Sequence, residues 1–350
     1  MEKQFRDKSY AAEPDRGMLT IVTGAYGFLG REIMTQLRER GCRVRGLAHT
    51  VKPDIPVPEG ADIITGDLLD PGSLDPLFAG IKPQSSVIIH TAGRISMRKR
   101  DALCERVNYL GTLNLIRACK RYGVRRFIYV SSVDALTPDG DDQAVKEPER
   151  FDVSRSRTSY SRSKAAASQL VLDSASEEMG CTVLLPSAII GPGDYNRGFI
   201  TRLIGLYLSG CPRISISGGY EFVDVRDAAS AAITASQKSA GASCYILSSE
   251  YASFRRILDI LAAYAGRKPS MINVPLWALD IAAPLVEAGC LVMHREPLMT
   301  AGAVGIIRSR PVYDHNKASL ELGFFPCPIE QSVVDTAEFV LAQLNKSCPA

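Results

Sequence analysis

The chain has 350 residues, enough for one large α/β domain with a smaller lobe, or for two domains. Its hydrophobic content of 46% and charged content of 23% are ordinary for a soluble globular protein, and a formal net charge of +3 gives no reason to expect nucleic-acid binding. Nine scattered cysteines, without C-x-x-C or metal-ligand spacing, indicate free thiols in the cytoplasm and no metal site.

The amino-terminal residues 1–17 are polar and lack periodicity, so we expect a disordered leader that is not a secretory signal. The most apolar stretch, residues 271–293, carries Asp280, Glu287 and two prolines. A membrane-spanning helix tolerates these residues poorly, so we expect no integral membrane segment.

A strand, a glycine turn and a helix follow the leader. Residues 19–23 are an apolar, β-branched run that predicts a buried parallel strand, and residues 31–40 have helical spacing. Between them, Gly24, Gly27 and Gly30 have the spacing G-x-x-G-x-x-G. Glycines at such a turn let a pyrophosphate approach the helix amino terminus, so the order predicts a dinucleotide site.

Strands and helices then alternate along the chain. Further strands are predicted at residues 43–48, 62–65, 86–90, 126–130 and 181–185, and helices at residues 73–78, 101–122 and 158–179. This alternation predicts an α/β fold, a Rossmann-like doubly wound parallel sheet over residues 18–185. From residue 186 the strands shorten, which predicts a smaller mixed α/β substrate-binding lobe over residues 186–345, with some segments returning to the first domain.

Tyr160 and Lys164 are four residues apart in a predicted helix, so their side chains share one face. A fixed ammonium close to a phenol lowers the pKa of the phenol, which is ordinarily near ~10. A tyrosine activated in this way can act as an acid–base catalyst near neutral pH. The same spacing also occurs in exposed helix pairs, so its meaning depends on the other motifs.

Those other motifs follow in a fixed order. They are Gly66-Asp67-Leu68, His90-Thr91-Ala92-Gly93, Val107-Asn108-Tyr109-Leu110-Gly111-Thr112, Val130-Ser131-Ser132, Leu185-Pro186-Ser187-Ala188-Ile189-Ile190-Gly191-Pro192-Gly193-Asp194 and Phe222-Val223-Asp224-Val225-Arg226-Asp227. With the glycine turn and the Tyr160–Lys164 pair, they resemble the extended short-chain dehydrogenase/reductase (NAD(P)-dependent epimerase/dehydratase) superfamily over about residues 18–345. Within it, the chain is similar to dihydroflavonol 4-reductases and 3β-hydroxysteroid dehydrogenase-like proteins.

The resemblance implies four catalytic residues. Tyr160 would donate a proton to the substrate carbonyl or remove one from the alcohol. Lys164 would lower the pKa of Tyr160 and hold the nicotinamide ribose. Ser132, with Ser131 as the adjacent alternative, would hydrogen-bond the substrate oxygen, and Asn108 would help to hold a water-mediated proton relay near the lysine.

The resemblance also implies a set of cofactor-binding residues. They are Gly24, Tyr26, Gly27, Phe28, Leu29, Gly30, His49, Asp67, Leu68, Thr91, Ala92, Gly93, Tyr160, Lys164, Pro186 and Ser187. NAD-selective sites carry an acidic residue after the second strand, where this chain has Ala48 followed by His49. No carboxylate there would repel a 2′-phosphate, which favours NADP over NAD.

The implied activity is NAD(P)H-dependent interconversion of a ketone and a secondary alcohol on a small-to-medium, fairly apolar substrate. A nucleotide-sugar epimerase or dehydratase is the alternative, although no arginine stands shortly before Phe222 and Val133 interrupts the acidic pair typical of dehydratases. A non-catalytic NAD(P)-binding regulator is a second alternative, against which Tyr160 and Lys164 both argue.

Contacts with the substrate are expected at Ser132, Asp134, Tyr195, Asn196 and Phe199. The basic residues at 94–100 are either a solvated loop or a holder for an anionic substrate. A small-molecule substrate is the expected partner, and a homodimer through the helices at residues 101–122 and 158–179 is a further hypothesis.

Overall fold

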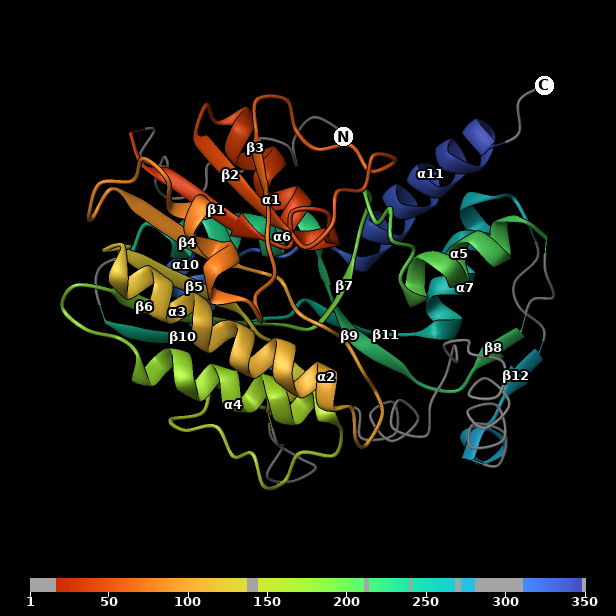
Figure 1. Cartoon of the computed structure of the whole chain (residues 1–350). Helices are drawn as coiled ribbons and strands as arrows, with labels where there is room; N and C mark the ends of the chain where they lie inside the picture. Colours follow the sequence, from red (N-terminus) through yellow and green to blue (C-terminus); the bar gives the residue numbers. More distant parts are fainter. Residues whose placement is uncertain are drawn as a thin grey trace.

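The computed structural model describes residues 17–136, 144–210, 214–238, 241–267, 272–280 and 311–347. At its centre is a seven-stranded sheet in the order β10-β6-β5-β4-β1-β2-β3, and every neighbouring pair is parallel (Figure 1). The strands are β1 (Leu19–Thr23), β2 (Arg43–Ala48), β3 (Asp62–Thr65), β4 (Ser86–His90), β5 (Arg126–Val130), β6 (Gly180–Pro186) and β10 (Ala242–Leu247). The inner strands β1, β4 and β6 are buried along their whole length, as their apolar runs predict.

Helices cover both faces of this sheet, which confirms the doubly wound fold. One face is covered by α1 (Phe28–Glu39) and α6 (Val225–Ala235), and the other by α2 (Ala102–Glu105), α3 (Gly111–Arg121), α4 (Ser159–Asp173) and the 3₁₀ helix Pro71–Phe78. Ile33 and Met34 are fully buried on the first face, and Leu115 and Val171 on the second. Two close-packed cores therefore hold the strand ends in fixed positions.

The second lobe contains two small sheets. Its elements are β7 (Ala188–Ile190), β9 (Gly219–Asp224) and β11 (Glu250–Ser253) in one sheet, β8 (Ile214–Ile216) and β12 (Ile272–Val274) in the other, and helices α5 (Phe199–Leu208), α7 (Phe254–Tyr264) and α11 (Ile329–Ser347). Ile204, Phe222 and Val333 belong to its separate apolar core. Between these elements the chain returns to the large sheet with β10 and α6, and α10 (Asn316–Leu322) packs against both.

Two predicted helices differ in detail from the structure. The helix expected at residues 101–122 contains a π-helical turn, Arg106–Leu110, which joins α2 to α3. Helix α4 ends at Asp173, several residues before the predicted end. There, Ser174 Oγ donates a hydrogen bond to the carbonyl of Leu170 (2.7 Å) and Ser176 Oγ accepts one from Met179 N (3.2 Å), so serine side chains compete with helix formation.

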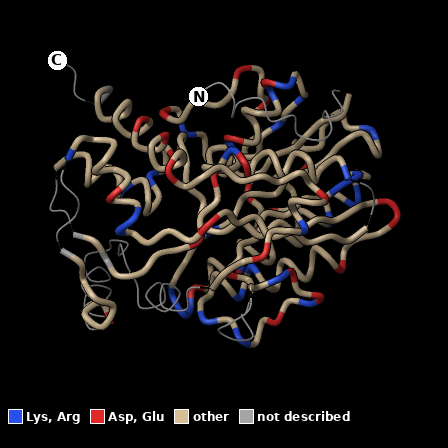
Figure 2. Tube along the Cα trace, turned by 180° about the vertical axis from the view of Figure 1, so that it is seen from behind, with Lys and Arg blue, Asp and Glu red and all other residues tan. Residues whose placement is uncertain are grey.

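Positive and negative residues are interspersed along the chain trace, in keeping with the small net charge (Figure 2). Within the described ranges, no helix combines the length and apolarity needed to cross a bilayer. In the same ranges, no group of three or more histidine, cysteine or acidic side chains could hold a metal ion. The predicted leader, except Gly17, lies outside the described residues, as do Met271 and residues 281–293 of the apolar stretch.

Candidate active site

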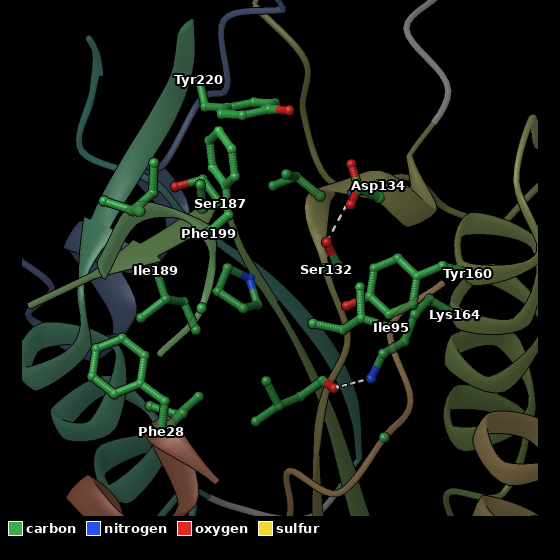
Figure 3. A pocket seen from close by; sticks show the side chains of 18 of the residues that line it. Phe28, Ile95, Ser132, Asp134, Tyr160, Lys164, Ser187, Ile189, Phe199 and Tyr220 are labelled. Atoms are coloured by element: carbon green, nitrogen blue, oxygen red, sulfur yellow. Dashed lines mark hydrogen bonds between the residues drawn. The ribbon is translucent and has the colours of Figure 1, made fainter. Parts of the chain in front are cut away.

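A cavity of about 720 Å³ lies at the carboxyl edge of the large sheet, where it meets the second lobe. Ligands of doubly wound sheets bind at this edge. Figure 3 shows Phe28, Ile189, Ser187 and Tyr220 on one side of it. Ser132, Asp134 and Tyr160 present oxygen atoms from the other side, where Ile95 also lies.

The predicted pair of Tyr160 and Lys164 lines this cavity from α4, where both side chains are buried. Lys164 Nζ donates a hydrogen bond to the carbonyl of Val130 (2.7 Å) at the end of β5. The same nitrogen lies 4.6 Å from the ring centroid of Tyr129 and 6.0 Å from that of Tyr160. The four-residue spacing thus places phenol and ammonium on the cavity-facing side of the helix, as predicted.

The pKa of Tyr160 differs in direction from the sequence-based expectation. Burial raises this pKa above its ordinary value, and the Asp134 carboxyl raises it further, while a hydrogen bond with Ser132 lowers it. Burial also lowers the pKa of Lys164 to about 7. Desolvation therefore dominates at both groups, and a lowering of the Tyr160 pKa by Lys164 stays a prediction.

We expect Lys164→Met to raise the free energy of unfolding more near pH 6 than near pH 10. The folded-state pKa of Lys164 is about 7, below its ordinary 10.5, so the unfolded chain binds more protons between these values and wild-type stability rises with pH. Burial of the charged Lys164 lowers the free energy of unfolding by its full amount below about pH 7 and by nothing above about pH 10.5. At about 1.4 kcal/mol per pKa unit, the full amount is several kcal/mol. Denaturant titrations at both pH values check this, and equal gains would contradict it.

The structure distinguishes the two adjacent serines. Ser131 Oγ accepts a hydrogen bond from Ser168 Oγ (2.7 Å) on α4. Ser132 Oγ accepts one from Asp134 N (3.1 Å) and so begins the short 3₁₀ helix Val133–Ala135, beside Tyr160. The serine beside the phenol is therefore Ser132, the residue that was favoured from the sequence.

Asn108 is buried in the π-helical turn, where an extra residue per turn often marks a functional position. Its Oδ1 accepts from Arg94 N (2.8 Å), and its Nδ2 donates to Arg94 O (2.9 Å) and Ser163 Oγ (2.9 Å). A Cβ atom at Gly93 would lie 3.2 Å from Asn108 Oδ1 and 3.4 Å from Lys164 Nζ. Asn108 thus fixes the loop next to the lysine, and its part in a proton relay stays a prediction.

The glycine turn fits a dinucleotide. Gly24 has a φ of +74°, and Gly27 begins α1 without a side-chain cap, so side chains leave the first N–H groups of the helix open to an anion. A Cβ atom at Gly30 would lie 2.4 Å from the carbonyl oxygen of Gly24 and 2.7 Å from Thr91 Oγ1. Only glycine permits this close approach of backbone to backbone.

The remaining predicted cofactor residues divide into two groups. Gly27, Phe28, Leu29, Gly30, Thr91, Gly93, Tyr160, Lys164, Pro186 and Ser187 line the cavity, whereas Gly24, Tyr26, His49, Asp67, Leu68 and Ala92 lie outside its lining. The buried hydroxyl of Ser187 has no hydrogen-bond partner within the described chain, which leaves it available to a bound group. His49 is exposed after β2, and Asp67 Oδ1 accepts a hydrogen bond from Leu69 N (2.9 Å).

The predicted substrate residues meet different outcomes. Ser132, Asp134, Asn196 and Phe199 line the cavity. Tyr195 is not part of the lining: its ring lies under the Arg31 guanidinium (4.9 Å) and against Phe339 (5.1 Å), and a substrate contact there stays a prediction.

Sequence reasoning missed three tyrosines of the cavity, Tyr220 on β9, Tyr251 on β11 and Tyr313. Tyr313 reaches the site through an isolated bridge to Val145 and a hydrogen bond from its N–H to Glu221 Oε1 (3.2 Å). It is more than 150 residues from Tyr160 along the chain, and no local pattern in the sequence connects the two.

A glycine turn built for a pyrophosphate, together with a buried serine, tyrosine and lysine at the same sheet edge, defines an NAD(P)-dependent enzyme of the extended short-chain dehydrogenase/reductase type. Residues 20–246 match the model of the NAD dependent epimerase/dehydratase family, and the chain belongs to this family. Relatives of the chain are named as reductases and dehydrogenases, and the chain is an oxidoreductase of this family.

Among curated proteins, the "Putative dihydroflavonol 4-reductase" of Synechocystis sp. is 31% identical and covers 91% of this chain and 93% of its own. Sterol demethylase protein B of Methylococcus capsulatus is 27% identical, and the match covers 91% of this chain and 97% of that protein. The crystal structure of gox2253 is similar at 28% identity (TM-score 0.75; 93% and 98% covered). UDP-glucose 4-epimerase of Thermotoga maritima, with UDP-glucose, shares the fold at 19% identity (TM-score 0.76; 93% and 100% covered).

Proposed function

We propose that the protein reduces a ketone to a secondary alcohol, and catalyses the reverse reaction, with NADP(H) preferred to NAD(H). The substrate is small to medium in size and fairly apolar. The observation that carries this proposal is a cavity into which Ser132 and Tyr160 present hydroxyl groups and which Phe28, Ile189 and Phe199 also line (Figure 3). A carbonyl held by the two hydroxyl groups leaves the body of the substrate against these apolar side chains.

In this mechanism, the cofactor supplies the hydride that reaches the carbonyl carbon. Ser132 donates a hydrogen bond to the carbonyl oxygen, and Tyr160 transfers its proton to the same oxygen as negative charge develops there. The raised pKa of Tyr160 keeps the phenol protonated near neutral pH, which suits a proton donor in the direction of reduction. The Lys164 ammonium lies near enough to stabilise the phenolate that remains.

Asp134 and Phe199 complete the proposed substrate contacts. Asp134 lies next to Ser132, because its N–H donates a hydrogen bond to Ser132 Oγ. Figure 3 shows the hydroxyl of Tyr220 directed toward the same side of the cavity. Burial raises the pKa of the Asp134 carboxyl. These groups suit a substrate with a second hydrogen-bonding group next to its carbonyl.

The names of two relatives support the proposal of ketone reduction. Besides the Synechocystis protein, a quinoline-oxide ketoreductase of Stigmatella aurantiaca is 28% identical over 88% of this chain and 92% of its own. The nucleotide-sugar alternative has one favourable observation, because Arg98 and Arg202 line the cavity and could bind a diphosphate. Glu221 also lines it, and its carboxylate would repel such a group.

Turnover with a substrate panel tests the proposal. NADPH oxidation should be detectable with steroid, flavonoid-like or small alicyclic ketones. It should be slower with NADH, because β2 ends in Ala48, followed by His49, and neither is a carboxylate that would repel a 2′-phosphate. Absorbance of the reduced cofactor gives the rate. Turnover of UDP-sugars alone would replace the proposal with the epimerase alternative, and tight cofactor binding without any turnover would favour the regulator.

The proposed homodimer would bring together α2, α3 and α4 of two copies, which lie side by side in Figure 1. Leu103, Tyr109 and Leu110 expose apolar side chains on the first of these helices and the π-helical turn that follows it. Burial of that surface would stabilise a dimer, and light scattering of the purified protein would determine the mass.

A further inference from the structure

One amide side chain joins three separate segments above the glycine turn. Asn196 belongs to the connection between β7 and α5 in the second lobe. Its Nδ2 donates a hydrogen bond to the carbonyl of Tyr26 (2.7 Å), inside the glycine turn. Its Oδ1 accepts one from Lys52 Nζ (2.6 Å), in the loop after β2. The second lobe therefore contacts both the glycine turn that follows β1 and the loop that follows β2.

The connection that carries Asn196 is itself held in shape. Asp194 is buried, and its Oδ2 accepts hydrogen bonds from Gly198 N (2.6 Å) and Thr201 Oγ1 (2.7 Å) at the start of α5. Arg197 has a φ of +51°, a backbone conformation that is uncommon for a residue with a side chain. Such a conformation persists where its surroundings fix it, so Asn196 is presented in a defined position.

The residue before Asn196 makes a second contact with the first domain. The ring of Tyr195 lies under the guanidinium of Arg31 (4.9 Å), in the first turns of α1, and packs against Phe339 of α11 (5.1 Å). A Cβ atom at Gly193 would lie 2.4 Å from an Arg31 terminal nitrogen, so the backbone passes close to this cation. The connection thus contacts both the glycine turn and the helix that follows it.

These contacts surround the place where a dinucleotide enters. The glycine turn faces the pyrophosphate, and the loop after β2 faces the adenosine ribose, in folds of this kind. Asn196 and Gly198 line the cavity beside Gly27 and Phe28. We propose that Asn196, with Lys52 and the Tyr26 carbonyl, forms a clasp that retains the bound dinucleotide, so that release requires these hydrogen bonds to break.

The clasp assigns Asn196 to cofactor retention. The proposal rests on dinucleotide binding alone and is independent of the reaction that follows. Its test therefore needs no substrate: NADPH bound to the protein is displaced by excess NADP⁺, and the loss of its fluorescence gives the release rate.

We expect Asn196→Ala to release NADPH about tenfold faster than the wild type, the order expected for the loss of two hydrogen bonds. Lys52→Ala removes one of them and should give a smaller increase, about threefold. Arg197→Ala changes the exposed neighbour and is the matched control. Thermal unfolding of each variant, without cofactor, separates a local effect from a loss of fold.

Two results would overturn the clasp. One is an unchanged release rate in both Asn196→Ala and Lys52→Ala. The other is an equal increase in Arg197→Ala, which would assign the effect to general loosening of the connection. Failure of every ketone in the panel would leave this measurement intact, so the two proposals can fail separately.

Discussion

Tyr160→Phe should abolish turnover and leave cofactor binding within about twofold of the wild type. The substitution removes only the hydroxyl that gives its proton to the substrate oxygen, and general acid–base catalysis contributes roughly 10²–10⁴-fold to a rate. The ring and its packing on the cavity wall are kept, so the fold should not change. The kcat of ketone reduction and NADPH titration by fluorescence measure the two effects.

A matched control for this variant is Tyr264→Phe, which removes a phenolic hydroxyl from an exposed position on α7. It should have wild-type kcat. A Tyr160→Phe enzyme that keeps more than about a tenth of the wild-type kcat would exclude Tyr160 as the proton donor.

Gly30→Ala should weaken NADPH binding by at least about tenfold and lower the free energy of unfolding by roughly 1–3 kcal/mol. Its Cβ would lie 2.4 Å from the Gly24 carbonyl oxygen and 2.7 Å from Thr91 Oγ1, so the turn or the end of β4 must move. Both Gly24 and Thr91 lie at the carboxyl edge of the large sheet, where the cofactor is expected to bind. Fluorescence titration and urea denaturation measure the losses.

Gly205→Ala is the control for that variant, because its Cβ on α5 would meet only Val340, at 3.6 Å. Alanine is the better helix former by about 1 kcal/mol, so this variant should be slightly more stable and bind NADPH normally. If Gly30→Ala bound NADPH as tightly as Gly205→Ala does, the glycine turn could not be the pyrophosphate site.

The large sheet was predictable from the sequence because each of its inner strands is a short apolar run, and a parallel sheet buries such runs on both faces. The bounds of β2, β3, β4 and β5 are those predicted. Tyr160 and Lys164 were predictable because helix geometry converts a spacing of four into a shared face. Local rules were enough for both.

Features of the site that depend on contacts between distant segments could not be predicted from local sequence patterns. The direction of the pKa shift of Tyr160 follows from burial among residues of several elements, which a spacing does not reveal. Tyr220 enters the cavity from β9 of the second lobe, and Tyr313 through a bridge to Val145. Tyr195 is directed to Arg31 by a turn whose geometry its sequence leaves open. The π-helical turn at Asn108 likewise has no periodic signal of its own.

The last strand of the large sheet, β10, comes from residues on the far side of an excursion through β7, α5, β8, β9 and α6. A fragment that stopped after β6 would lack β10 and would leave β6 as an unprotected edge, able to pair with another chain. The halves of this protein therefore cannot be shuffled as independent modules in evolution or in the laboratory. Exchanges within the excursion, at residues such as Ile189 or Phe199, can alter the cavity while both ends of the excursion stay anchored in the same sheet.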